Sequence, residues 1–265
     1  RASSVNGILG VLPDPTTGKV NFTGDLDLRL RNGLHRGEAI DLNWRSLKDK
    51  TQDLKLRFNL PYLFRTPFGT DLSLKIFKRD TTFLEVTTRA AIDYLHGRND
   101  RMSAFVNNRS SERLGRNTTA QAGLADVRLT SYGLSYEREL FDYKFNPRRG
   151  SSFTMEASAG RKRTVEGVVL NGEVPPTINS DQYEWSAKAI GHIAIGGRGT
   201  VRFVAQGEGM VNDKLYTNEL FRIGGIKDLR GVDEASILAS SVVIGTAELR
   251  FILEENSNAF VFFDQ

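Results

Sequence analysis

Thirteen consecutive residues, Val20 to Asn32, alternate between apolar and polar positions without a break. The apolar positions are Val20, Phe22, Gly24, Leu26, Leu28 and Leu30, and the polar ones include two aspartates and two arginines. Because successive side chains of a β-strand point to opposite faces, the segment predicts one long strand with an apolar face and a charged face. It exceeds the usual strand of about five or six residues and reaches the about 9–11 residues that a tilted strand needs to cross a bilayer.

The same alternation recurs along most of the chain. It predicts strands over residues 2–12, 20–32, 38–46, 52–62, 70–79, 82–96, 101–113, 127–137, 152–160, 183–195, 200–209, 240–253 and 258–265. Turn residues separate them, as in Asn146-Pro-Arg-Arg-Gly150 and in the glycine-rich segment 196–199. No segment has the periodicity of an amphipathic helix, and no linker divides the chain. The sequence therefore predicts one all-β, antiparallel domain over residues 1–265, with about thirteen strands.

Two folds are compatible with this alternation. In a soluble sandwich the apolar face is the core, whereas in a membrane barrel it meets lipid and the polar face lines the lumen. Three features favour a transmembrane β-barrel: long strands of similar length, an apolar face almost free of charge, and aromatic residues near strand ends. These aromatic residues are Trp44, Tyr62, Phe64, Tyr94, Phe141 and Tyr183. The pattern alone leaves a soluble β protein open.

Composition narrows the function classes. Hydrophobic residues make up 39% of the chain, and the mean hydropathy of −0.34 is typical of a soluble protein. Barrel strands also give such averages, because only alternate residues are apolar. The longest apolar run, Ala259 to Phe263, is far shorter than the about 18 residues of a membrane helix. The absence of cysteine excludes disulfides and thiolate metal sites, and the modest net charge of +4, with the two signs interleaved, gives no support to nucleic-acid binding.

One glycine-rich segment, Asn218 to Val232, lies between two late strands. Its distinctive residues are Gly224, Gly225, Leu229, Arg230, Gly231 and Val232. The simplest interpretation is a loop with two turns. A phosphate-binding loop is a second interpretation, but no strand-to-helix context supports it.

A third interpretation rests on a resemblance. The segment resembles the signature loop of the superfamily of outer-membrane assembly and secretion barrels that includes BamA, TamA and FhaC, in which a GG…(V/L)RG(F/Y) loop folds into the lumen. Val232 stands where the family usually has an aromatic residue, which leaves the neighbouring stacking contact open. The resemblance implies that Arg230 pairs with acidic residues of the next two strands, here Glu248 and Asp264, both at lumen-facing positions. The alternative is an ordinary lumenal salt bridge.

The resemblance extends over essentially the whole chain. Asn146–Gly150 is similar to the family's periplasmic turn before the ninth strand, and Leu60–Phe64 is similar to the end of its fourth strand. It implies a barrel of sixteen strands, with the arginine loop between the eleventh and twelfth. We therefore expect the chain to end inside the thirteenth strand, with further strands after it and POTRA domains before Arg1.

The implied function is non-enzymatic. The resemblance implies an outer-membrane assembly factor of a Gram-negative bacterium that folds and inserts β-barrel proteins through a lateral gate. Its expected partners are the lipid bilayer, unfolded β-barrel clients, accessory lipoproteins and periplasmic chaperones. Val5, Gly7 and Gly10 lie on the first strand, which we expect to pair weakly with the final strand of the barrel and to accept a client strand. These glycines could equally be ordinary turn-adjacent residues.

Two rival functions stay open. One is a two-partner-type secretion pore, since the arginine loop occurs in both branches of the superfamily. The other is an outer-membrane hydrolase, which the three histidines, His35, His96 and His192, do not support because none has a serine partner at a recognisable spacing. No His/carboxylate cluster has the spacing of metal ligands, and no cofactor is expected.

Overall fold

The chain consists mainly of β-strands. The computed structural model describes residues 3–13, 20–46, 51–79, 82–114, 123–143, 146–166, 176–225, 228–233, 235–254 and 257–265. Its strands are β1 (Ser4–Pro13), β2 (Val20–Arg31), β3 (Ala39–Ser46), β4 (Gln52–Leu60), β5 (Phe68–Arg79), β6 (Phe83–His96), β7 (Asp100–Arg113), β8 (Asp126–Phe141), β9 (Gly150–Val165), β10 (Thr177–Ile195), β11 (Gly199–Val211), β12 (Phe221–Ile223), β13 (Ile237–Ala239), β14 (Ser241–Glu254) and β15 (Ser257–Asp264). None of these described segments is a helix long and apolar enough to cross a membrane.

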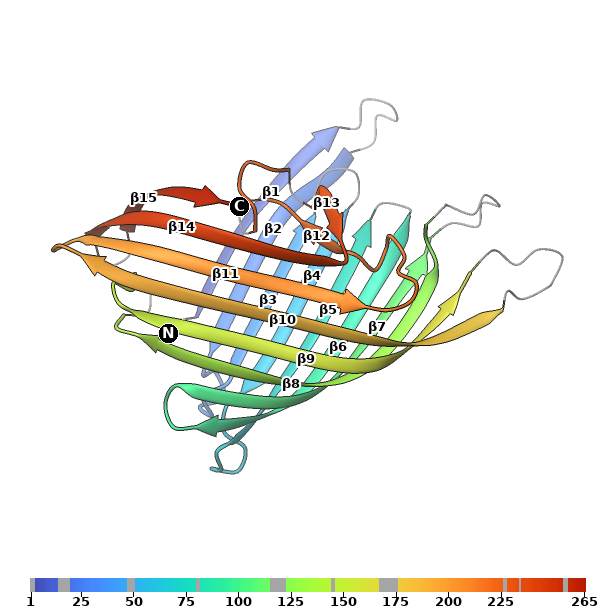
Figure 1. Ribbon diagram of the computed structural model, residues 1–265, viewed down its shortest axis with the longest axis horizontal. Coiled ribbons are helices and arrows are strands. Elements are labelled where there is room, and N and C mark those ends of the chain that lie inside the picture. Colours follow the sequence, from blue (N-terminus) through green and yellow to red (C-terminus); the bar gives the residue numbers. More distant parts are fainter. Residues whose placement is uncertain are drawn as a thin grey trace.

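Thirteen of the strands form one antiparallel sheet in chain order, in which β14 follows β11 directly. The sheet curves around an interior, with β8–β11 and β14 in front and β1–β7 behind (Figure 1). Within the described chain its edges are β1 and β15, and β12 and β13 form a separate hairpin. The predicted strand positions and the antiparallel order are confirmed. The short hairpin strands were missed because three residues are too few to show a period.

Several strands are longer than the alternation predicted. The strand predicted at 183–195 starts at Thr177, and the one predicted at 152–160 continues to Val165. In these extensions polar residues lie on both faces, as in Arg161-Lys162-Arg163, so the alternation of polarity disappears while the backbone stays extended. At the start of β9 the turn requires glycine: Gly150 has φ of 113°, and a Cβ there would lie 1.9 Å from the carbonyl oxygen of Leu140.

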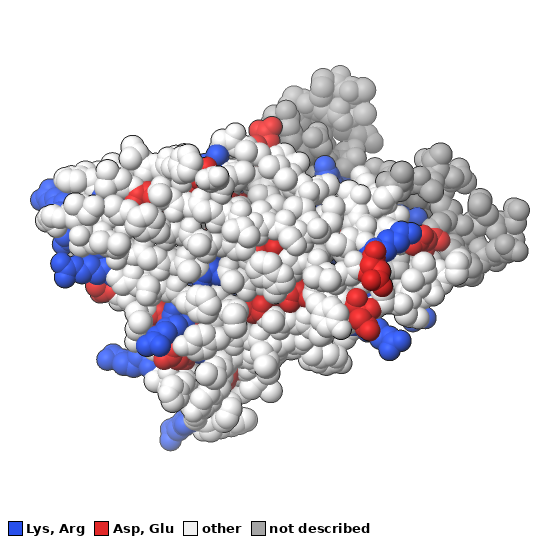
Figure 2. Space-filling model, viewed as in Figure 1, with Lys and Arg blue, Asp and Glu red and all other residues white. Residues whose placement is uncertain are grey.

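Burial decides between the two folds. Inward-facing side chains that are buried are largely polar, and outward-facing ones that are exposed are largely apolar. The buried polar set includes Asp53, Asp71, Glu85, Asp93, Lys162, Gln182, His192 and Glu248, and the exposed apolar set includes Leu26, Leu72, Ile92, Leu134, Ile193, Phe203 and Leu249. The visible outer face is mostly uncharged between the strand ends (Figure 2). This distribution is the reverse of a soluble sandwich and is that of a transmembrane β-barrel.

The two ends of the sheet differ in their connections. At one end the connections are short, as at 97–99 and 196–198, and at the other they include the long segments 114–125, 166–176 and 212–240. Outer-membrane barrels have short periplasmic turns and longer extracellular loops. Of the predicted belt residues, Phe141 is an exception, because its ring packs edge-on against the buried His192, with centroids 5.5 Å apart.

Candidate functional site

The connection between β11 and β14 carries the glycine motif, and its hairpin is closed by the pairing of Phe221–Ile223 with Ile237–Ala239. Gly224 and Gly225 have φ of 120° and 95°, and a Cβ on Gly224 would lie 2.2 Å from the carbonyl oxygen of Asp233. Only glycine fits such a conformation readily. The backbone N–H of Gly225 donates to the carbonyl oxygen of Val232 at 3.0 Å, and Gly225 also forms a bridge with Leu229. The glycines thus fold the segment into a tight turn from which Arg230 projects.

The structure brings Arg230, Glu248 and Asp264 together. Nε and Nη2 of Arg230 donate to the two carboxylate oxygens of Asp264, each at 2.7 Å, and its backbone N–H donates to the same group at 3.2 Å. Nη1 donates to Oε1 of Glu248 at 2.8 Å. The Arg230 side chain is 16% exposed, and those of Glu248 and Asp264 are 4% and 3% exposed. This two-point fork fixes the tip of the loop on β14 and on the edge strand β15.

Glu248 also holds two arginines that the sequence analysis did not single out. Oε2 of Glu248 lies 3.1 Å from Nη1 of Arg202 and 2.5 Å from Nη2 of Arg250. Arg202 lies opposite Glu248 in the β11–β14 register, and Arg250 lies two residues further along the same strand face. In the sequence, both arginines occupy lumen-facing positions of their strands. This alone did not identify them, because many other charged residues occupy such positions. The result is a group of three guanidinium and two carboxylate groups around the tip of the loop.

The stacking contact left open by Val232 comes from β15. The guanidinium carbon of Arg230 lies 3.7 Å from the ring centroid of Phe262 and 5.8 Å from that of Phe260. Both rings therefore lie on the interior side of β15, where their cation–π attraction to Arg230 adds to its ion pairs. The sequence hid this role, because the run Phe260-Val-Phe-Phe263 is apolar on both faces.

A second arginine, Arg222 on β12, holds the hairpin against the opposite wall. Its Nη2 lies 3.7 Å from Oε2 of Glu85 on β6. Its guanidinium carbon lies 4.6 Å and 5.0 Å from the ring centroids of Phe77 and Phe83. The hairpin therefore contacts β5 and β6 through Arg222 and β14 and β15 through Arg230.

The start of the loop is anchored to a third region of the wall. Lys162 on β9 and Glu219 form an ion pair of 2.9 Å, and each side chain is only 1% exposed. Beside them, Nδ2 of Asn218 donates to Oγ of Ser111 at 2.8 Å and to the carbonyl oxygen of Ala125 at 2.9 Å. Buried ions need partners, so these groups hold the loop firmly where it leaves the rim.

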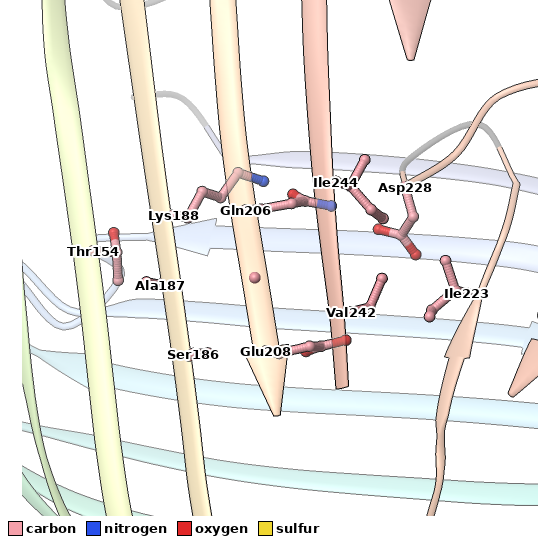
Figure 3. Close-up of a pocket in the computed structure, with 11 residues that line it drawn as sticks. Thr154, Ser186, Ala187, Lys188, Gln206, Glu208, Ile223, Asp228, Val242 and Ile244 are labelled. Atoms are coloured by element: carbon pink, nitrogen blue, oxygen red, sulfur yellow. The ribbon is translucent and has the colours of Figure 1, made fainter. Parts of the chain in front are cut away.

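A cavity of about 310 Å³ separates the hairpin from the wall formed by β9–β11 and β14. In Figure 3, Gln206 and Glu208 extend from β11 on one side, and Asp228 of the loop lies on the other. Lys188 lines the same space. The lining of the cavity is mixed: it carries both signs of charge and also the apolar side chains of Ile223, Val242 and Ile244. No group of three or more His, Cys, Asp or Glu side chains in the described chain could hold a metal ion.

The first-strand residues lie apart from this site. β1 pairs with β2 along its whole length, from Ser4 opposite Arg29 to Pro13 opposite Val20, and its other edge is unpaired in the described sheet. A Cβ on Gly10 would lie 2.8 Å from Oγ1 of Thr23, and one on Gly7 would lie 3.4 Å from Cδ1 of Leu26. Val5 is exposed, and Ile8 and Leu9, on opposite faces, are 77% and 79% exposed. Pairing of this strand with the end of the barrel stays a prediction.

Comparisons with known proteins agree with this architecture. The sequence profile described as the Omp85 superfamily domain matches residues 32–265. Among solved structures, the chain is similar to BamA from Haemophilus ducreyi lacking POTRA domains 1–3, with a TM-score of 0.62 and 12% sequence identity. That match covers 98% of this chain, which spans 62% of the length of the matched chain. A search of curated proteins gives no match.

Proposed function

The chain belongs to the Omp85 superfamily. We propose that residues 1–265 form the barrel domain of an assembly factor in the outer membrane of a Gram-negative bacterium. The factor folds and inserts β-barrel proteins and catalyses no covalent reaction. Its partners are the lipid bilayer, unfolded β-barrel clients, and accessory lipoproteins and periplasmic chaperones that deliver them.

The observation that carries this proposal is the fixation of the loop tip on the edge strand. Arg230 binds Asp264 of β15 with two parallel hydrogen bonds and stacks on Phe262 of the same strand. Glu85 on the opposite wall and Lys162 on β9 hold the other parts of the loop. The loop therefore braces β14 and β15 from inside the barrel.

The other edge supports the same mechanism. β1 is the first strand of the sheet and exposes apolar side chains on both faces, including Ile8 and Leu9. When such a strand separates from the final strand of the barrel, its free edge can template an incoming strand through main-chain hydrogen bonds, and its apolar side chains suit a client that is inserted into lipid. Gly7 and Gly10 weaken side-chain packing on this strand, which makes exchange of its partner easier.

A secretion pore is the alternative within the superfamily. Its support is the charged interior, where a cavity of about 340 Å³ is lined by Arg57, Arg89, Asp93 and Glu156 among others. The hairpin held at Arg222, Arg230 and Glu219 does not distinguish the two functions, because the arginine loop occurs in both branches of the superfamily.

The test is depletion of the full-length protein, followed by quantification of outer-membrane proteins. An assembly factor lowers the folded level of many β-barrel proteins. Loss of a single exported protein, with normal barrel levels, identifies a secretion pore instead. Purified full-length protein in vesicles should also accelerate folding of a urea-denatured barrel. Arg230→Gln should slow this folding more than the charge-matched control Arg36→Gln, which changes an exposed arginine in the turn between β2 and β3.

A further inference from the structure

Three arginines lie on the outer surface of β8 and β9, near the ends of these strands at the long loops. Arg161 and Arg163 are exposed, whereas Lys162 and Thr164 between and beside them are buried. Since side chains alternate along a strand, the two arginines point away from the interior that Lys162 enters. Arg128 of β8 is also exposed. This set, Arg128, Arg161 and Arg163, is called the outer arginine patch below.

The patch lies directly beyond a row of aromatic side chains. In the register of β8, β9 and β10, Tyr132, Ala159 and Tyr183 form one outward row. The next outward row toward the short-turn end contains Leu134, Ala157 and Trp185. Exposed tyrosine and tryptophan in such positions mark the interface between hydrocarbon and headgroups. The surface beyond them should therefore meet headgroups.

The register places the arginines at this height. Arg161 lies in the first row beyond the tyrosines, and Arg128 and Arg163 lie in the second. One row is about 7 Å along a strand, which a strand tilt of about 35–45° reduces to about 5 Å along the membrane normal. The headgroup layer is about 5–8 Å thick on each side of the hydrocarbon, so both rows are within reach of it. Figure 2 shows charged side chains gathered near these strand ends, beside a mostly uncharged surface.

The charges within the patch are not balanced by the protein. Arg128 and Arg163 are directly opposite each other on neighbouring strands, an arrangement that destabilises a sheet unless an anion lies between them. Arg128 has one partner, Glu112 at 3.0 Å. Within the described chain, Arg161 and Arg163 form no ion pair, although Asp181 lies opposite Arg161 in the register. Two carboxylates therefore face three guanidinium groups.

We propose that the outer arginine patch binds phosphate groups of anionic lipids in the leaflet on the long-loop side. A guanidinium fork matches phosphate geometry, and one phosphate between Arg128 and Arg163 would convert a repulsive pair into two attractive ones. The inference depends on the membrane placement described under Proposed function, but not on the assembly activity. It assigns a lipid-binding role to a surface outside the lumenal loop.

The experiment compares full-length protein in vesicles of phosphatidylcholine alone with vesicles that also contain phosphatidic acid. The readout is the temperature at which the folded, fast-migrating band is lost on a gel. We expect phosphatidic acid to raise this temperature for the wild type. Arg161→Gln/Arg163→Gln should retain about a third of the rise, since one of three arginines near the surface remains. In phosphatidylcholine alone, the double variant should be as stable as the wild type or more stable, because the repulsion of Arg128 and Arg163 is gone.

The charge-matched control is Arg36→Gln together with Arg65→Gln, two exposed arginines in short turns at the other end of the sheet, which should keep the full rise. Equal rises in the wild type and the patch variant would overturn the proposal. So would an equal rise on adding inorganic phosphate to phosphatidylcholine vesicles, because the site would then not select lipid. Client folding, measured in the same phosphatidylcholine vesicles, tests the proposed function separately.

Discussion

At the scale of single residues, the lumenal site depends on one guanidinium that satisfies two carboxylates. Arg230 has hydrogen bonds to Asp264 and Glu248 and an aromatic ring, Phe262, beneath it. Lysine could keep the charge but not the fork or the planar stacking. The geometry therefore explains why arginine occupies this position.

We expect Arg230→Gln to lower the free energy of unfolding by about 3–5 kcal/mol, because it leaves two buried carboxylates with fewer partners. A double-mutant cycle with Glu248→Gln should give a coupling of about 0.5–3 kcal/mol, measured by urea unfolding in lipid. Strictly additive losses would contradict direct pairing. Arg230→Lys should recover only part of the loss.

At the scale of elements, the hairpin loop is held where it leaves the rim by Lys162 and Glu219, both almost fully buried. Removing one partner leaves the other charge buried without a counter-charge. Replacing both with apolar residues of similar size removes the need for pairing. Lys162→Met should thus destabilise by about 3–5 kcal/mol, and Lys162→Met/Glu219→Leu by clearly less. Urea unfolding of the three proteins tests this, and a double variant worse than the single one would contradict it.

A neighbouring cluster outside the membrane predicts a pH effect. The hydrogen bond from Lys214, at 2.6 Å, and then that from the Tyr216 hydroxyl hold the pKa of Glu166 below its ordinary value. A depressed carboxyl pKa stabilises the fold above the unfolded pKa of about 4.3, and the contribution is lost as the pH falls through the folded pKa. The protection factors of the amides near Tyr216, which correct for the intrinsic pH dependence of exchange, should therefore fall in acid, and Glu166→Gln should abolish this loss of protection.

At the scale of the whole molecule, the outer surface is apolar because lipid, not water, surrounds it. Leu134 on β8 and Leu34 in the β2–β3 turn are almost equally exposed, at 69% and 68%. In water both would tolerate arginine. In a bilayer, Leu134→Arg should cost about 1–2 kcal/mol, because Leu134 lies just inside the interface row of Tyr132 and not at the bilayer midplane, whereas Leu34→Arg should be nearly neutral.

The measurement is folding into vesicles, followed by the heat-dependent shift in gel mobility. Similar behaviour of the two variants would argue against the membrane placement, as would a folded protein that stays soluble without detergent.

The sequence by itself determined where the strands lie, which residues share a face and which loop carries Arg230, because period-two alternation and glycine turns are local properties. It could not decide which face points inward, since a sandwich and a barrel give the same alternation. Only the tertiary structure decided that Asp71 and Lys162 are inside and Leu134 outside. It also identified Arg202, Phe262 and Arg222 as parts of the site, because the curvature of the sheet brings together strands that are far apart in sequence.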